Sequence, residues 1–203
     1  MIKDFKKPNI VISKVYTKNG DSGNTKLVGG QIRSKSNLRI KCYGEIDELN
    51  SIIGGCIEVL NLIKHNTKLF LELISNLKKI QNELFNLGTM FATLPEDMDD
   101  KMPRIKEKHI KFLEIEMDKY NKDLSPLNSF VLPGGSQGNI WLHLARTVCR
   151  RVERNAVSLS KCEELDANAI IYLNRLSDAF FIYSRWIIKF ENKEEYIWDP
   201  NNS

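Results

Sequence analysis

A stripe of basic side chains follows a Pro-Gly-Gly break in the second half of the chain. The break ends at Ser136, whose hydroxyl can cap a helix, and a helical pattern runs from there past residue 154. Projected at about 100° per residue, one arc of this helix is basic and carries one carboxylate. Guanidinium groups match phosphate oxygens in pairs, so the stripe suits a polyphosphate clamp, although charged stripes are more often simply solvated. The arc consists of His143, Arg146, Arg150, Glu153 and Arg154.

The opposite arc of the same helix is apolar and is predicted to face the core. A cysteine, Cys149, lies between the two arcs, where a buried structural thiol is favoured over a nucleophile. The apolar arc consists of Trp141, Leu144, Val148, Val152 and Leu159.

A second candidate for anion binding is the segment 15–30, which holds four glycines among Thr, Asn, Asp and Lys. Glycine permits backbone conformations in which consecutive N–H groups form an anion-binding nest. The segment contains no G-x-x-x-x-G-K-[ST] pattern, so it is not a Walker A loop. A pair of surface turns is the alternative interpretation. Its hydroxyl and ammonium donors are Thr17, Lys18, Thr25 and Lys26, with Arg33 and Lys35 downstream.

The sequence lacks the residues that several other chemistries require. Helical bundles often hold di-iron sites, but no E-x-x-H motif is present, and the three histidines lie in separate segments. The four cysteines show no C-x-x-C spacing, which argues against zinc and favours isolated reduced thiols. No G-x-S-x-G elbow or kinase motif set occurs. No protein metal ligand is therefore firmly assigned.

Five helical segments must position these residues. Apolar residues recur at spacings of three and four, and strand-like alternation is nearly absent. The pattern predicts an all-α, up-and-down bundle of four or five helices, preceded by the irregular glycine-rich segment. In the first helix, Asp47 and Glu48 are expected in the opening turns, where acids suit the helix dipole, and Gly54-Gly55 can mark a close helix approach. The segments are 41–64, 68–92, 104–121, the helix after Ser136, and 166–190.

Composition limits the class of protein and its partners. The 203 residues are 42% hydrophobic and 28% charged, which is typical of a single globular domain. The net charge of +4 is too small and dispersed for a nucleic-acid binder. No apolar run approaches a membrane span, and the N-terminus has neither a signal-peptide core nor an Arg-rich transit pattern. We therefore expect a cytoplasmic protein, with an organellar matrix as the other compartment that fits.

Five stretches, taken together, resemble the motifs of the PduO-type ATP:cob(I)alamin adenosyltransferases. They occur in the family's order over about residues 14–190, with 1–13 as a lead-in and 191–203 as a tail. This combination is far more specific than any single motif. The stretches are 16–23 (YTKNGDSG), 43–50 (YGEIDELN), 130–136 (FVLPGGS), 142–154 (LHLARTVCRRVER) and 172–178 (YLNRLSD).

The resemblance implies an enzyme that transfers the 5′-deoxyadenosyl group of ATP to cob(I)alamin, releasing triphosphate and using Mg²⁺. It further implies a homotrimer of helical bundles with active sites between subunits. A cobalamin reductase and an adenosylcobalamin-dependent enzyme are possible partners, and neither nucleic acid nor a membrane is expected.

The resemblance also assigns residues by motif position. The N-terminal ATP clamp would be Thr17, Lys18, Asn19, Gly20, Thr25, Lys26 and Lys35. The rest of the nucleotide site would be Arg150, Arg151, Val152, Glu153, Arg154 and Asn174, partly from the neighbouring subunit. Arg150 would also act in catalysis, Asp47 and Arg146 would bridge subunits, and Phe130 would lie near the cobalt and exclude its lower axial ligand.

Two alternatives remain open at this point. One is a non-catalytic cobalamin or ATP sensor or carrier on the same bundle; the other is a structural helical module whose charged stripes are only solvated. The chain also departs from many family members at Ser22, Gln137, Gly138 and Trp141, where we expect repacking rather than lost activity. The stretch 196–198 can contribute to the corrin pocket.

Overall fold

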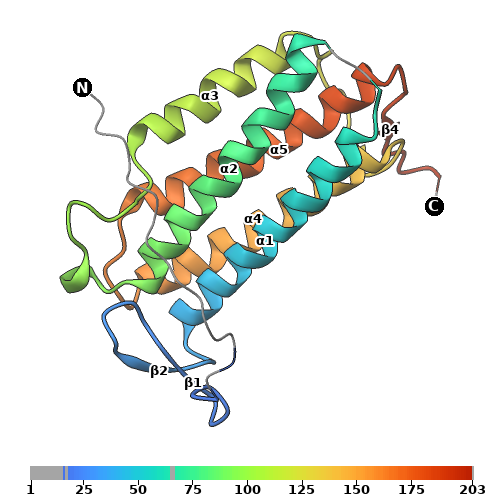
Figure 1. The fold of residues 1–203 in the computed structure, drawn as a ribbon. Coiled ribbons are helices and arrows are strands. Elements are labelled where there is room, and N and C mark those ends of the chain that lie inside the picture. Colours follow the sequence, from blue (N-terminus) through green and yellow to red (C-terminus); the bar gives the residue numbers. More distant parts are fainter. Residues whose placement is uncertain (1–15, 17, 65–66, 203) are drawn as a thin grey trace, which may run out of the picture.

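The computed structural model describes residues 16, 18–64 and 67–202. In this part of the chain five α-helices are present, and they lie together as a bundle (Figure 1). The all-α prediction is confirmed. None of the helices in this part of the chain combines the length and apolarity that crossing a membrane requires. The helices are α1 (Leu38–Asn61), α2 (Lys68–Ala92), α3 (Glu107–Asn121), α4 (Gln137–Ser160) and α5 (Ala167–Phe190), with a 3₁₀ turn, η1, at Pro95–Asp97.

The helices pack in the order α2, α1, α4, α5 and α3, and all five contribute side chains to one apolar core. α1 and α4 run side by side in Figure 1. They approach closely at Gly55, where a Cβ atom would lie 2.9 Å from the Trp141 ring. The close approach expected from the glycine pair is therefore confirmed for Gly55, which leaves room for the bulky Trp141.

α1 begins earlier than its apolar pattern suggested. Asn37 caps it, with its Oδ1 accepting a hydrogen bond from the Arg39 backbone N–H at 2.9 Å. Asp47 and Glu48 consequently lie well beyond the first turn, so their predicted helix-dipole role is wrong. α3 begins later than predicted, at Glu107, because the backbone of Lys106 is still extended.

The two faces of α4 differ from the predicted arcs. Val148, Val152 and Leu159 are buried as expected, but Leu144 is 43% exposed. His143, predicted on the polar arc, is 3% exposed. The reason is that α4 is covered on two sides, by α1 and by α5, so the buried part of its surface is wider than one apolar stripe and rotated from it.

Short strands occur where almost none was predicted. β1 (Asn24–Lys26) pairs antiparallel with β2 (Ile32–Ser34), so the glycine-rich segment contains a hairpin. β3 (Val131–Leu132) pairs antiparallel with β4 (Tyr196–Ile197), which attaches the C-terminal tail to the connector before α4. Within the tail, Glu195 accepts a hydrogen bond at 2.7 Å from Arg185, which is only 5% exposed.

Candidate functional site

The N-terminal hairpin surrounds a cavity of about 540 Å³ that gathers most of the predicted ATP clamp. Amide, hydroxyl, ammonium and backbone groups converge on it, as an anionic ligand requires. Thr17 lies outside the described residues, and Lys18 is exposed but does not line the cavity. The lining residues are Asn19, Gly20, Ser22, Asn24, Thr25, Lys26, Ile32 and Lys35.

Two backbone positions give this segment its shape. Lys18 has a φ of 60° and Gly23 a φ of 80°. Lys18 begins one tight turn and Gly23 ends another, and each turn is closed by a backbone hydrogen bond. The Gly23 carbonyl then accepts a hydrogen bond from the Lys35 backbone N–H at 2.8 Å. A Cβ atom on Gly20 would lie 2.9 Å from the Lys35 Nζ atom, so glycine lets the ammonium group approach the backbone.

The hairpin is hydrogen-bonded to the end of α2 and to the η1 turn that follows it. The Val28 backbone N–H donates to the Ala92 carbonyl at 2.9 Å, and Gln31 Nε2 donates to Asp97 Oδ2 at 2.6 Å. Beneath these contacts, Leu27 packs against Ile40 and Leu94 in a small separate cluster. The hairpin is therefore packed against the rest of the fold and is not a loose pair of turns.

A second polar group lies between α4 and α5. Asn174 Nδ2 donates to Glu153 Oε1 at 2.9 Å. Burial raises the pKa of the Asp178 carboxyl, with the positive charges of Arg175 and Arg150 opposing the rise. Arg150 is exposed and makes no ion pair within the described residues. The family resemblance assigned Asn174 to the nucleotide site but did not assign Asp178.

Arg146 and His143 lie on α4 where it contacts Phe181 and Ser184 of α5. Arg146 Nε donates to His143 Nδ1 at 3.3 Å, and the Arg146 guanidinium lies 6.0 Å from the Phe181 ring centroid. Burial, followed by the charge of Arg146, lowers the pKa of His143 to about 4. His143 is therefore a neutral core residue, and its Nε2 is within hydrogen-bond distance of Ser184 Oγ at 3.3 Å.

The other α4 residues assigned to ATP differ in accessibility. Arg151 is paired with Glu48 and Glu45 of α1 in the same chain. The Val152 side chain is fully buried in the core and has no surface to offer a ligand. Arg154 is exposed, with no ion pair in the described part of the chain. Cys149 is completely buried and its pKa is raised by burial, as expected for a structural thiol.

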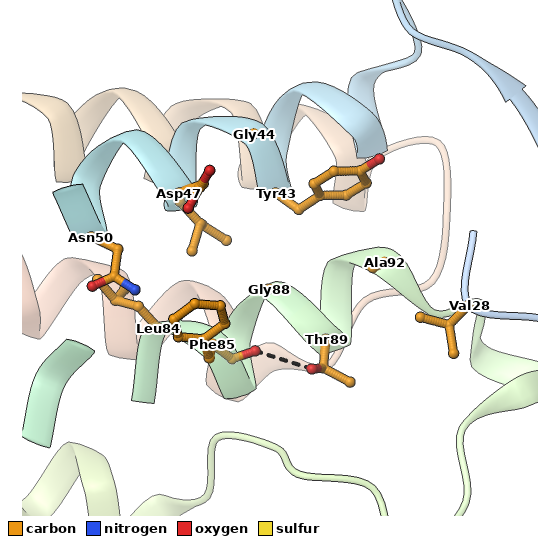
Figure 2. Close-up of a pocket in the computed structure, with 11 residues that line it drawn as sticks. Val28, Tyr43, Gly44, Asp47, Asn50, Leu84, Phe85, Gly88, Thr89 and Ala92 are labelled. Atoms are coloured by element: carbon orange, nitrogen blue, oxygen red, sulfur yellow. Dashed lines mark hydrogen bonds between the residues drawn. The ribbon is translucent and has the colours of Figure 1, made fainter. Parts of the chain in front are cut away.

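Asp47 lies in a shallow groove between α1 and α2, with a volume of about 430 Å³ (Figure 2). The Asp47 carboxylate has no ion-pair partner within the described residues, and Arg146 does not line this groove. The groove is largely apolar, and Phe85 at its edge is 69% exposed. The exposed Phe85 ring and the Asp47 carboxylate therefore line the same groove.

Phe130 is 77% exposed at the end of the connector that precedes β3. Its ring meets Trp198 edge-on, with the two centroids 6.0 Å apart. The backbone is held as well, because the Trp198 N–H donates to the Phe130 carbonyl at 2.8 Å. The C-terminal tail therefore presents a second aromatic ring beside the one predicted to approach cobalt.

The predicted nucleotide residues occupy two separate surfaces of one chain. Among the residues that the structure describes, those lining the hairpin cavity all lie within 19–35, and none of the predicted α4–α5 residues lines it.

Comparison with known proteins assigns the class. Residues 15–187 match the cobalamin adenosyltransferase family. The corrinoid adenosyltransferase of Bacillus subtilis is 44% identical over 172 residues, covering 85% of each chain. The corrinoid adenosyltransferase MMAB of Homo sapiens is 36% identical, covering 94% of this chain and 75% of the human protein.

Solved structures agree with the sequence matches. A variant of the PduO-type ATP:corrinoid adenosyltransferase from Lactobacillus reuteri, complexed with cobalamin and ATP, superimposes with a TM-score of 0.83. It is 35% identical, and the alignment covers 91% of this chain and 99% of the other. The chain belongs to the cobalamin adenosyltransferase family.

Proposed function

We propose that this chain, acting as one domain, transfers the 5′-deoxyadenosyl group of ATP to cob(I)alamin and forms adenosylcobalamin and triphosphate. Two observations support the proposal beyond family membership. The hairpin gathers five of the predicted ATP-clamp residues around one cavity, and Glu153 and Asn174 meet between α4 and α5.

The reaction needs no nucleophile from the protein. The cobalt of cob(I)alamin supplies the electron pair that forms the bond to C5′, and the C5′–O bond breaks with its electrons passing to triphosphate. The protein must place C5′ in line with cobalt and stabilise the departing charge. Arg150 and the ammonium groups of the hairpin suit the second task.

A magnesium ion bound to the ATP phosphates fits this site. Within the described residues no group of three potential ligands gathers. That is compatible with Mg²⁺, which typically uses one or two carboxylates beside substrate phosphates. Glu153 and Asp178 are the carboxylates that would hold it, and the ion would neutralise charge on the triphosphate.

The active enzyme is a homotrimer in this proposal, with each nucleotide site shared between two subunits. The hairpin would come from one subunit and the α4–α5 residues from the next. Asp47, whose carboxylate has no ion-pair partner among the described residues, would pair with Arg146 of the neighbour. The exposed ring of Phe85 would be covered in the same interface.

Phe130 would exclude the lower axial ligand from the cobalt. An aromatic ring held at the surface can occupy that position only if its backbone is fixed, and the contacts with Trp198 supply this support. The cytoplasm is the proposed compartment, and the bacterial relative from Bacillus subtilis is consistent with it. A cobalamin reductase and an adenosylcobalamin-dependent enzyme are the proposed partners before and after the reaction.

The direct test mixes the protein with ATP, Mg²⁺ and chemically reduced cob(I)alamin without oxygen. We expect the absorbance change of cobalt–carbon bond formation, a photolabile product and an equal amount of triphosphate. ATP binding without product would instead favour a sensor or carrier, and absence of ATP binding would favour a structural bundle.

A further inference from the structure

The amide of Asn174 is held in one orientation by bonds at both of its ends. Its Nδ2 donates to Glu153 Oε1 at 2.9 Å, and its Oδ1 accepts from Arg175 Nη1 at 2.8 Å. A carboxylate only accepts hydrogen bonds and a guanidinium only donates them. The two partners therefore leave the amide no alternative orientation that satisfies both.

Arg175 is in turn held by α3. Its Nε donates to Glu114 Oε1 at 2.8 Å. The guanidinium therefore bonds to Glu114 and to Asn174 through different nitrogens, which uses the rigid fork of the arginine side chain. A lysine has the same charge but a single nitrogen on a flexible stem, so it does not reproduce this geometry.

The result is a relay of four side chains across three helices: Glu114 of α3, Arg175 and Asn174 of α5, and Glu153 of α4. Only one carboxylate oxygen of Glu153 is used by Asn174. The other oxygen makes no hydrogen bond with the described residues and is available to a ligand. The direction in which it points depends on Asn174.

A contribution to folding stability does not explain the ion pair between Arg175 and Glu114 in the relay. The Arg175 side chain is 38% exposed and that of Glu114 is 44% exposed. Ion pairs at such exposure contribute on average little to stability. α3 is already attached to the core by Ile110, Leu113 and Tyr120, which are all buried.

We propose that Arg175 and Glu114 are positioning residues of the nucleotide site, which act through Asn174 to orient Glu153 toward ATP and its magnesium ion. This inference rests on the proposed assignment of Asn174 and Glu153 to the nucleotide site. Neither Arg175 nor Glu114 touches the ligand.

The test compares Glu114→Gln and Arg175→Lys with a control on the same helix. Glu107→Gln removes a carboxylate at the start of α3 whose ion pair with Lys111, at 2.7 Å, is exposed and includes no member of the relay. We expect Glu114→Gln and Arg175→Lys each to weaken ATP binding, by calorimetry, about tenfold and to raise the KM for ATP correspondingly. The KM for cob(I)alamin and the Tm should stay unchanged, and Glu107→Gln should behave as the wild type.

The double variant provides a readout that a general structural defect would not give. If the two residues act in one relay, Glu114→Gln combined with Arg175→Lys should weaken ATP binding no more than either change alone. Additive losses would overturn the relay, as would a fall in Tm accompanied by equal increases in both KM values.

Asn174→Ala separates failure of the relay from failure of the proposed site. If Asn174→Ala weakens ATP binding and Glu114→Gln does not, the relay is overturned and the proposed function stands. If Asn174→Ala has no effect, the assignment of Asn174 and the relay both fail. If the wild type binds ATP without turnover and Glu114→Gln still weakens that binding, the relay is supported and the proposed enzymatic activity is contradicted. A wild type that binds no ATP would overturn both.

Discussion

Arg150 illustrates how a residue's surroundings decide what its charge can do. It is exposed and unpaired within the described residues, whereas its neighbour Arg151 is neutralised by Glu45 and Glu48. A free guanidinium beside Glu153 and Asp178 can meet an incoming phosphate without breaking an existing ion pair. The family resemblance assigned both arginines to ATP, and the structure places them in different charge environments.

We predict that Arg150→Ala lowers kcat/KM about 100- to 1000-fold, because it removes a preorganised charge that would stabilise the departing triphosphate. The far-ultraviolet circular dichroism spectrum and the Tm should be retained, since the side chain is exposed. Lys161→Ala, a change at an exposed cation just after α4, is the control and should leave turnover unchanged. Near-normal turnover of Arg150→Ala would contradict this role.

His143 is predicted to make stability depend on pH. Its pKa is lowered to about 4 in the folded protein, against about 6.5 when unfolded. Between these values the unfolded chain binds the additional proton, so stability should fall as pH falls from 6.5 toward 4, by at most about 3 kcal/mol. His143→Gln should remove this contribution.

The measurement is urea unfolding of wild type and His143→Gln at pH 7 and pH 4.5, at one protein concentration. Carboxyl groups titrate in both proteins, so the quantity of interest is the difference between their pH responses. Equal responses would show that His143 does not titrate as described.

At the scale of elements, the contact between α1 and α4 depends on one of two adjacent glycines. A Cβ atom on Gly55 would lie 2.9 Å from the Trp141 ring, whereas one on Gly54 would lie 3.4 Å from the flexible end of Gln81. Alanine is intrinsically better than glycine inside a helix by about 1 kcal/mol. The two positions should therefore respond to the same substitution in opposite directions.

We predict that Gly54→Ala is neutral or stabilising and that Gly55→Ala destabilises the protein by about 1–3 kcal/mol through overpacking. Thermal unfolding of both variants checks the difference. Adding Trp141→Leu to Gly55→Ala should recover part of the loss, because it removes the ring that clashes. A Gly55→Ala variant as stable as Gly54→Ala would show that α1 and α4 do not approach closely here.

At the scale of the whole molecule, the separation of the two nucleotide-binding surfaces makes mixing experiments informative. Lys35→Ala damages the hairpin surface and Arg150→Ala damages the α4–α5 surface. If each site combines surfaces of two subunits, co-expression should rebuild intact sites from one undamaged surface of each variant. Random assembly of a cyclic oligomer would restore about one quarter of the sites.

We therefore expect the co-expressed pair to regain about a quarter of wild-type turnover, although each variant alone is nearly inactive. Sedimentation should give the mass of a trimer in every sample. Turnover no higher than that of the separate variants would show that both surfaces serve a site within one chain.

The sequence by itself determined the helices and the residues available for chemistry. Apolar spacing predicted the helices α1 and α5, in which Ile46, Ile53, Leu173 and Phe180 are buried, and Ser136 was correctly expected to cap α4. Such signals act within a few residues of the chain, so they can be read locally. The motif order likewise indicated the family before any fold was known.

Only the tertiary structure decided which of those residues meet. His143 is buried because α5 covers the face of α4 that a single apolar stripe leaves polar. Glu114 accepts a hydrogen bond from Arg175, a residue 61 positions further along the chain. Helical periodicity shows that a face is covered but carries no information on which neighbour covers it, so such contacts depend on the packing of the whole bundle.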